Sequence, residues 1–299
     1  MRKKRKIREG NPIATILIYI AVGLLAFVCV YPMYFVLMLS LSEPRSAIAM
    51  NTYLLPKGFS TIAYETIVKD KELWRGFANS ILYAAGSTVL MLITSALAAY
   101  GLSYRQLIGR KFITLFLLIP MYFGGGMIPS YLLMTSLGLY GSPLSQIIPA
   151  GFSIWNIILV RSYFRTIPEG LQEAARIDGA GVLKVLLAII VPLAKPIFAV
   201  IAVYTIVGSW NSWFGAMLYL PDVKWQPLQM FLKRILVQNT LNIDRTVTAE
   251  AAKLQAIKEL SNVQVKYAII IFTSLPVLAT YPFFQKYFVK GMVLGSLKE

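Results

Sequence analysis

The sequence predicts an all-α membrane protein with six transmembrane helices, and its composition is the first reason. Apolar residues make up 57% of the 299 residues and charged residues only 14%, whereas a soluble domain carries about 25% charge. Long stretches without a charged residue recur along the chain, and a bilayer crossing needs about 20 apolar residues. The net charge of +16 comes from basic residues interleaved with these stretches. That pattern is typical of the positive-inside bias of membrane proteins and argues against nucleic-acid binding.

Six hydrophobic stretches follow one another in the chain. They cover residues 13–41, 77–104, 112–135, 143–163, 185–219 and 267–288. Three glycines at 124–126 and Pro129 interrupt the third stretch. We expect its outer end to be irregular, which a membrane tolerates only against protein or water. Pro192 and Pro196 predict a break at the entry of the fifth stretch, because proline removes a helix hydrogen bond.

Basic residues between the stretches predict the orientation of the chain. One side, with both termini and residues 104–111 and 161–196, holds 17 basic and 5 acidic residues, against 12 and 8 on the other. The more basic side is therefore predicted to be cytoplasmic. The expected organisation is a basic N-terminus (1–12), a first helix (13–41), an extracellular segment (42–76), a transmembrane core (77–288) and a cytoplasmic tail (289–299). The core contains a cytoplasmic loop (164–192) and an extracellular segment (221–266), where helices are expected at 224–239 and 248–260.

The cytoplasmic loop carries the signals of a short helix. Thr166 and Glu169 have the spacing of a capping box at its start. Gly179 follows Asp178 where a left-handed C-terminal cap would fall. Between these signals, Leu171, Ala174 and Ala175 recur at helical spacing on one narrow face. Small residues allow a partner to approach closely, so we interpret the loop as a docking element. The alternative is an amphipathic segment that lies on the membrane surface.

This loop resembles the EAA loop of bacterial ATP-binding-cassette (ABC) importer permeases. The matching residues are Glu173, Ala174, Ala175, Gly179, Ile189, Val191 and Pro192. The chain departs from the family pattern only at Val191, where the family usually has leucine. FANS at 77–80, the turn at 100–110, WNSW at 210–213 and QKYFVKG near the C-terminus extend the likeness to the MalG-like carbohydrate permeases, and among them to the lipoprotein-linked permeases of Gram-positive bacteria.

The resemblance implies a type I (MetI-like) permease fold with a cytoplasmic coupling helix. It implies a subunit in the bacterial plasma membrane that forms half of the pathway for a carbohydrate, an oligosaccharide, and that couples to a separate ATPase by alternating access. The implied partners are a second homologous permease, a cytoplasmic ATPase dimer and an extracellular solute-binding lipoprotein. The residues expected to couple to the ATPase are Glu173, Ala174, Ala175, Asp178, Gly179 and Pro192.

Nothing in the sequence predicts a nucleotide or metal site. No G-x-x-x-x-G-K-[ST] motif occurs, so we expect the partner ATPase to bind ATP and Mg²⁺ and this chain to need no cofactor and to be no enzyme. The chain has no histidine and a single cysteine, Cys29, which disfavours a zinc or haem site and a disulfide framework. The resemblance implies that the C-terminal tail inserts at the ATPase dimer interface. The sequence alone equally favours a basic segment that simply ends the last membrane span on the cytoplasmic side.

Polar and aromatic residues inside the stretches are the candidates for a sugar pathway, since sugars present apolar faces and hydroxyl rims. They are Asn79, Tyr122, Asn156, Trp210, Asn211 and Trp213. The alternatives are interfacial anchoring for the tryptophans with an amide hydrogen bond between helices, and helix capping and packing for Asn79. Two other functions remain open: an ABC permease for a non-sugar solute, and an ion-coupled secondary transporter, which would use intramembrane carboxylates that these stretches lack.

Overall fold

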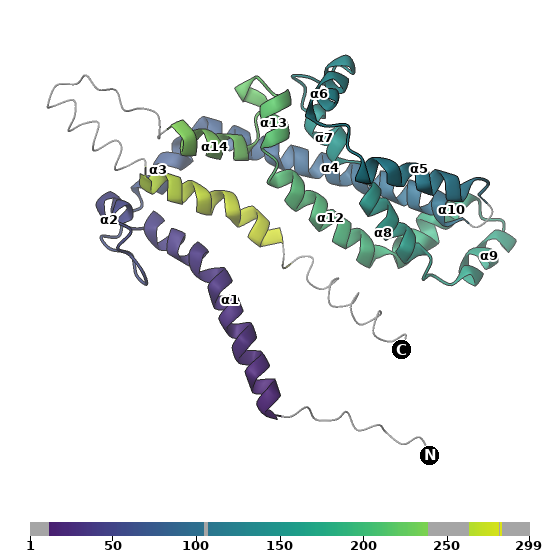
Figure 1. Cartoon of the computed structure of the whole chain (residues 1–299), viewed down its shortest axis with the longest axis horizontal. Coiled ribbons are helices and arrows are strands. Elements are labelled where there is room, and N and C mark those ends of the chain that lie inside the picture. The colour runs from purple at the N-terminus through teal and green to yellow at the C-terminus, as the bar shows by residue number, and fades with distance from the viewer. Residues whose placement is uncertain (1–11, 105–106, 239–262, 281, 283–299) are drawn as a thin grey trace. The chain divides into compact units, whose positions relative to one another are not determined.

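The structure, a computed structural model, describes residues 12–104, 107–238, 263–280 and 282, and these residues form helices and connecting turns without a strand (Figure 1). Three helices in this part are long and apolar enough to cross a membrane, and three bent helix pairs raise the number of candidate spans to six. The all-α fold predicted from the sequence is confirmed. The chain divides into two compact units, 1–69 with 238–272 and 70–237 with 273–299.

The first unit contains α1 (Pro12–Ser40), α2 (Pro44–Ile48), α3 (Ile62–Lys69) and the start of the helix Val263–Thr280. The long apolar side chains of α1 are exposed over most of its length. Such a helix is stable only where hydrocarbon replaces water around it. The predicted first span therefore matches α1 closely.

A buried amide holds the first unit together. The Gln264 side chain is fully buried and donates hydrogen bonds to the carbonyls of Ser40 and Ser60, both at 3.2 Å. The Ser40 hydroxyl lies 2.7 Å from the Tyr64 hydroxyl. Burial raises the pKa of Tyr64, so this phenol stays neutral at physiological pH.

The second unit is organised around α4 (Lys71–Ser103), which contains the predicted second span. Asp70 caps its first turn, where a carboxylate oxygen accepts a 2.7 Å hydrogen bond from the Glu72 N–H. The two carboxylates also interact favourably with the positive end of the helix dipole. The helix thus begins earlier than residue 77, the predicted start of the span.

A face of small and short polar residues lets α4 approach its neighbours. α4 packs against α7 (Leu144–Ala150), α8 (Ile154–Phe164) and α12 (Lys195–Trp210). Small residues at helix interfaces allow the close backbone approach on which association in membranes depends. The buried small residues of α4 are Gly76, Ser80, Ala84, Ser87, Ser95 and Ala99.

The predicted interruption of the third span is confirmed. α5 (Arg110–Tyr122) and α6 (Met127–Ser136) meet at an angle of 113°. Gly126 directly precedes α6 with φ +87°, a conformation that glycine adopts without strain. The glycine run therefore allows the chain to turn sharply between the two helices.

The predicted fifth span is wrong in its C-terminal part. A helical stretch, Val182–Leu193, and α12 meet at 80° around Ala194, between the two prolines, which confirms the predicted break. However, α12 ends at Trp210 and α13 (Phe214–Tyr219) is a separate short helix. The intervening Asn-Ser-Trp sequence explains the stop, because asparagine and serine side chains compete with helical backbone hydrogen bonds.

The remaining helices fit the prediction in part. The helix Val263–Thr280 begins ahead of the predicted start at 267, and the predicted end of this span lies outside the described residues. α14 (Leu228–Gln238) confirms the first helix expected in segment 221–266, and a 3₁₀ turn, Val223–Trp225, precedes it. The expected helix at 248–260, the N-terminus and the C-terminal tail also lie outside the described part.

One apolar core joins the ends of α4, α8 and α12 in the second unit. Its fully buried members include Ala99, Ile157, Val160, Ile190 and Ile201. The predicted docking helix is α9 (Glu169–Ile177), and the segment that follows it contributes buried residues to this core. The core therefore holds the C-terminal end of the docking loop in place.

Candidate functional site

The predicted docking helix is α9, and its C-terminal end is built by two backbone hydrogen bonds. The Gly179 N–H donates to the Arg176 carbonyl at 3.0 Å, and the Ala180 N–H donates to the Ala175 carbonyl at 2.9 Å. Gly179 has φ +79°. This is the Schellman arrangement, which needs a left-handed residue after the helix. The left-handed glycine predicted from the sequence is confirmed.

The capping box predicted at the start of α9 is wrong. Pro168 occupies the N-cap position, and among the described contacts no side chain caps this turn. The Thr166 hydroxyl instead donates a 2.7 Å hydrogen bond to the Tyr163 carbonyl, at the end of the preceding helix. Because the hydroxyl already serves α8, the first turn of α9 depends on Pro168, whose missing N–H and fixed φ suit a helix start.

The exposed face of α9 agrees with the predicted one only in part. Leu171 is 45% exposed and Ile177 86% exposed, and Glu173 and Ala174 are exposed beside them. Ala175, which was predicted to share the docking face, packs against the core of the unit instead. The outward face of α9 therefore combines apolar residues with the carboxylates of Glu169 and Glu173, and its small inward residue lets the helix lie close to its support.

A pocket of about 220 Å³ lies between α9 and the ends of α4 and α8. Glu173 and Gln172 line it from α9, and Arg165 lines it from the end of α8. On the same side, the Arg176 guanidinium lies 4.8 Å from the centre of the Tyr104 ring. This cation–π contact directs Arg176 toward α4.

Pro192 lies beyond a π-helical turn, Leu186–Ile190, that follows the docking loop. The residue is exposed and belongs to α11 (Val191–Leu193), just before the 80° bend. Extra-wide turns of this kind are frequent at functional sites. The geometry thus places Pro192 at a corner that connects α9 to the membrane helix α12.

Trp210 is the most deeply buried of the proposed pathway aromatics. Its indole N–H donates a 3.0 Å hydrogen bond to the Thr273 carbonyl, and its ring meets Phe77 edge to face with centroids 5.6 Å apart. Only 4% of Trp210 is exposed. Packing between helices accounts for this residue, and neither interfacial anchoring nor contact with a solute is needed to explain it.

Asn79 also has a structural partner, in the segment before α14. Its side-chain amide donates hydrogen bonds to the carbonyls of Lys224 and Gln226, at 2.9 and 3.1 Å. The sequence-based alternative of capping and packing is therefore right for packing and wrong for capping, because Asp70 caps α4. Asn79 lies well inside the helix and binds a segment distant in sequence.

The other predicted pathway residues are not brought together. Asn156 is buried and contacts the Met91 sulfur at 3.4 Å. Tyr122 is 73% exposed at the end of α5, and Asn211 is exposed after α12. The ring of Trp213 is 40% exposed and carries the Lys233 ammonium 3.8 Å from its centre. The six residues therefore do not form one site in this structure.

A small cavity, which sequence reasoning missed, lies between α4, α7 and α12. It has a volume of about 110 Å³. Hydroxyl and amide side chains line it together with an alanine and a glycine: Tyr83, Gln146, Ala150, Gly208, Ser209 and Ser212. Short polar side chains spread over three helices carry no local signal in the sequence, although their donors and acceptors would suit sugar hydroxyls.

Residues 222–228, here called the polar strap, are tied to α4 through their backbone. Besides the two bonds from Asn79, the Tyr83 hydroxyl donates to the Trp225 carbonyl at 2.6 Å, and the Leu228 N–H donates to the Ser80 hydroxyl at 2.9 Å. Gly76 lets the strap lie close, since an added Cβ would be 3.2 Å from the Leu228 Cα. The strap is therefore held against one face of α4.

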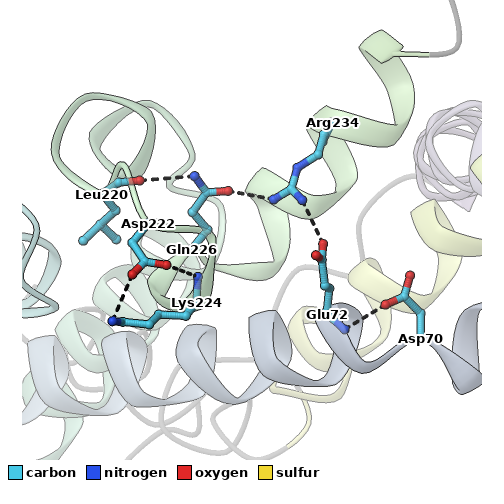
Figure 2. Close-up of polar contacts among 7 residues, drawn as sticks. All are labelled: Asp70, Glu72, Leu220, Asp222, Lys224, Gln226 and Arg234. Carbon is cyan, nitrogen blue, oxygen red and sulfur yellow. Dashed lines mark hydrogen bonds and ion pairs between the residues drawn. The ribbon is translucent and has the colours of Figure 1, made fainter.

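Charged groups extend this attachment to α14 (Figure 2). Arg234 donates to a Glu72 carboxylate oxygen and to the Gln226 side-chain oxygen, both at 2.8 Å, and Gln226 donates to the Leu220 carbonyl. Asp222 accepts from the Lys224 N–H, and this bond lowers the pKa of Asp222. These contacts join α14 to the start of α4.

Replacing Asn79 by aspartate should release the polar strap. A carboxylate has no N–H to donate, and it would face two carbonyl oxygens in a buried position. Leaving buried groups unpaired costs about 1–3 kcal/mol, and more for a charge. We expect trypsin to cleave after Lys224 at least about tenfold faster in the detergent-solubilised variant. The matched control is Asn211→Asp at an exposed position, and equal cleavage rates in the two variants would contradict the assigned role of Asn79.

The chain matches a protein-family model over residues 91–294, and that family is described as the binding-protein-dependent transport system inner membrane component. The matched segment contains α9, the corner at Pro192 and the polar strap, and it extends beyond the described helices toward the C-terminus.

Individual relatives match along almost the whole chain. The polygalacturonan/rhamnogalacturonan transport system permease protein YtcP of Bacillus subtilis is 33% identical over 96% of this chain and 99% of its own length. The melibiose/raffinose/stachyose import permease protein MelC of the same organism is 27% identical over 90% of this chain and 92% of its own. A solved bacterial ABC transporter involved in the import of the acidic polysaccharide alginate has a chain that is 33% identical, with a TM-score of 0.82 over 94% of this chain and 98% of that one.

Proposed function

We propose that this chain, which belongs to the family of binding-protein-dependent transport system inner membrane components, carries oligosaccharides of acidic sugars. Its general function follows from the relatives: it is a membrane-embedded permease subunit of a carbohydrate ABC importer. The proposal concerns the class of sugar. The observation that carries it is that the two 33% identical relatives are named for polygalacturonan/rhamnogalacturonan and for alginate, whereas a relative named for the sugars melibiose, raffinose and stachyose is 27% identical.

The charge pattern of the chain supports an acidic cargo. The segments assigned to the exterior hold more basic than acidic residues. Lys233 places its ammonium over the partly exposed Trp213 ring, so a cation and an aromatic surface lie together. Carboxylates pair with ammonium groups, and the apolar faces of sugars pack on indoles. Trp213, with Lys233 beside it, is the best placed of the sequence-predicted pathway residues for such a contact.

We further propose that α9 transmits work from a separate ATPase. The exposed apolar face of α9 suits a cleft in a partner, and Glu173 beside it can form a charge-assisted hydrogen bond. Closure of the ATPase dimer would move α9 and, through the corner at Pro192, α12. A two-state rearrangement of packed helices of this kind produces alternating access.

This coupling scheme defines the partners and the orientation that we propose. A second permease completes the pathway, an extracellular binding lipoprotein delivers the sugar, and both termini face the cytoplasm of a bacterial cell. ATP and Mg²⁺ belong to the ATPase. This chain contributes no catalytic residue and no cofactor site.

Uptake measurements test the acidic cargo. Cells that contain the complete importer should accumulate radiolabelled oligogalacturonate, and deletion of this chain should abolish that uptake. An excess of unlabelled oligogalacturonate should compete, whereas raffinose of the same length should not. Competition by raffinose alone would reject the acidic cargo and retain the carbohydrate permease. Uptake of acidic and neutral oligosaccharides that is unchanged by the deletion would reject both.

A further inference from the structure

Three arginines gather where α5 begins and α8 ends. Arg110 is the first residue of α5, Arg161 lies in the last turn of α8, and Arg165 is the C-cap residue of that helix. The positive charges of Arg110 and Arg165 both act on Arg161. Arg165 also lines the pocket that Glu173 lines. Among the residues that the structure describes, the ion pairs found are Lys224–Asp222 and Arg234–Glu72, so no described carboxylate forms an ion pair with Arg110 or Arg161.

Two of these guanidinium groups also have buried N–H groups without an acceptor. Arg110 Nη1 and Arg161 Nε are buried and unpaired within the described part of the chain. The other contact of Arg161 is a 3.2 Å hydrogen bond from Nη1 to the Thr114 hydroxyl, which itself donates to the Arg110 carbonyl at 2.7 Å. Thr114 thus links the Arg161 guanidinium to the first turn of α5, where Arg110 lies. An unpaired buried N–H of a charged group is costly, and so is the repulsion between the arginines.

A single anion between the arginines would remove both costs. Guanidinium groups present rigid forks of N–H donors that match phosphate oxygens. The first N–H groups of α5, a helix of 13 residues, add donors and a favourable dipole at the same place. Phosphate is the chemistry that this cluster fits best.

The flank of the cluster indicates that the phosphate carries hydrocarbon. Phe112, Leu115 and Phe116 follow Arg110 on α5 and are 73%, 61% and 61% exposed. A cationic end with exposed apolar residues one turn further along the helix matches a phospholipid, whose phosphate lies at the interface and whose chains extend into the bilayer. In the proposed orientation the cluster lies at the cytoplasmic face, where anionic lipids concentrate.

We propose that Arg110, Arg161 and Arg165 bind the phosphate of an anionic phospholipid at the cytoplasmic ends of α5 and α8. The inference needs the permease to be embedded in a membrane and is independent of the sugar that it carries. The lipid would act as a ligand that joins two helices, because one headgroup bridges side chains from both.

Native mass spectrometry of the assembled importer tests this site. The complex is transferred into nanodiscs made of equal amounts of phosphatidylglycerol and phosphatidylcholine and then released in the spectrometer. The wild-type complex should retain phosphatidylglycerol in preference. The double variant R110Q/R161Q should retain about tenfold less, and the control Lys195→Gln, at an exposed basic residue on the same side, should retain the wild-type amount.

Further arms separate the sources of the anion. If the double variant fails to assemble, the same measurement is made on Arg165→Gln, a change at an exposed position. This variant should also retain less phosphatidylglycerol than the wild type, with a smaller loss than the double variant. Retention of both lipids in equal amounts, or unchanged retention in the arginine variants, would overturn the proposal. Displacement of phosphatidylglycerol by excess inorganic phosphate would assign the site to free phosphate instead. Retention that appears only after the ATPase is removed would assign the arginines to a protein carboxylate.

Discussion

Replacing Gly179 by valine should strongly reduce solute uptake while the importer still inserts and assembles its membrane subunits. Gly179 has φ +79°, a conformation that costs an L-residue about 1–2 kcal/mol and more when the side chain is β-branched. Its N–H and that of Ala180 close the end of α9. Without the left-handed turn, α9 loses its direction relative to the segment that leads to α12. We expect uptake in cells, and ATPase activity stimulated by the binding protein, to fall at least about tenfold.

Backbone strain can be separated from steric clashes as the cause of this defect, because the space around Gly179 is open. Within the described chain, no atom lies within 4 Å of a Cβ built at Gly179 or at Gly181, but Gly181 has φ −66°. Gly181→Val is therefore the matched control, with the same loop, the same added side chain and no left-handed strain, and it should transport normally. Gly179→Asn should retain part of the activity, since asparagine tolerates this conformation. Full activity of Gly179→Val would show that coupling does not depend on the turn.

Local signals explain which parts of the docking loop the sequence could predict. The left-handed glycine was predictable because the requirement lies in one residue and its two neighbours. The prediction of a capping box was wrong although the spacing of its residues was right. The Thr166 hydroxyl has an alternative partner, the Tyr163 carbonyl, and a spacing rule does not rank competing partners. The prediction that Ala175 lies on the docking face was wrong for a related reason. Whether this side chain packs in the core or on the surface depends on where α8 lies.

The spans show the same division between local and distant causes. Hydrophobicity predicted where membrane helices occur, and proline and glycine predicted where they break. The angles of 113° and 80° at those breaks depend on packing against α4 and α8, which no local pattern records. Asn79 and Trp210 looked like pathway residues because they are polar or aromatic within apolar stretches. Their partners are 145 and 63 positions away in the sequence, so their packing roles became visible only in the fold.

Replacing Gly151 by alanine should produce a large loss of stability, because this glycine lies against α4 at the turn between α7 and α8. A Cβ added at Gly151 would lie 2.7 Å from the Leu90 Cβ, 2.6 Å from its Cγ and 2.4 Å from its Cδ2. A rotamer change cannot relieve the first of these clashes, since the Leu90 Cβ is fixed by the helix. The Gly151 carbonyl also accepts a 2.8 Å hydrogen bond from Thr94, so a retreat of the turn would break that bond. Overpacking of this kind costs about 1–3 kcal/mol.

A double-mutant cycle separates this clash from any general effect of alanine. Gly151 has φ −82°, so alanine adds no backbone strain there. Shortening the neighbour in Leu90→Ala removes the Cγ and Cδ2 contacts, and the double variant should regain part of the lost stability in thermal unfolding of the detergent-solubilised complex. Gly101→Ala is the matched control on α4, because its added Cβ meets no atom within 4 Å in the described structure, and it should unfold at or above the wild-type temperature. If the losses from Gly151→Ala and Leu90→Ala simply add, the two residues are not in contact and the packing of the α7–α8 turn on α4 is different from that described.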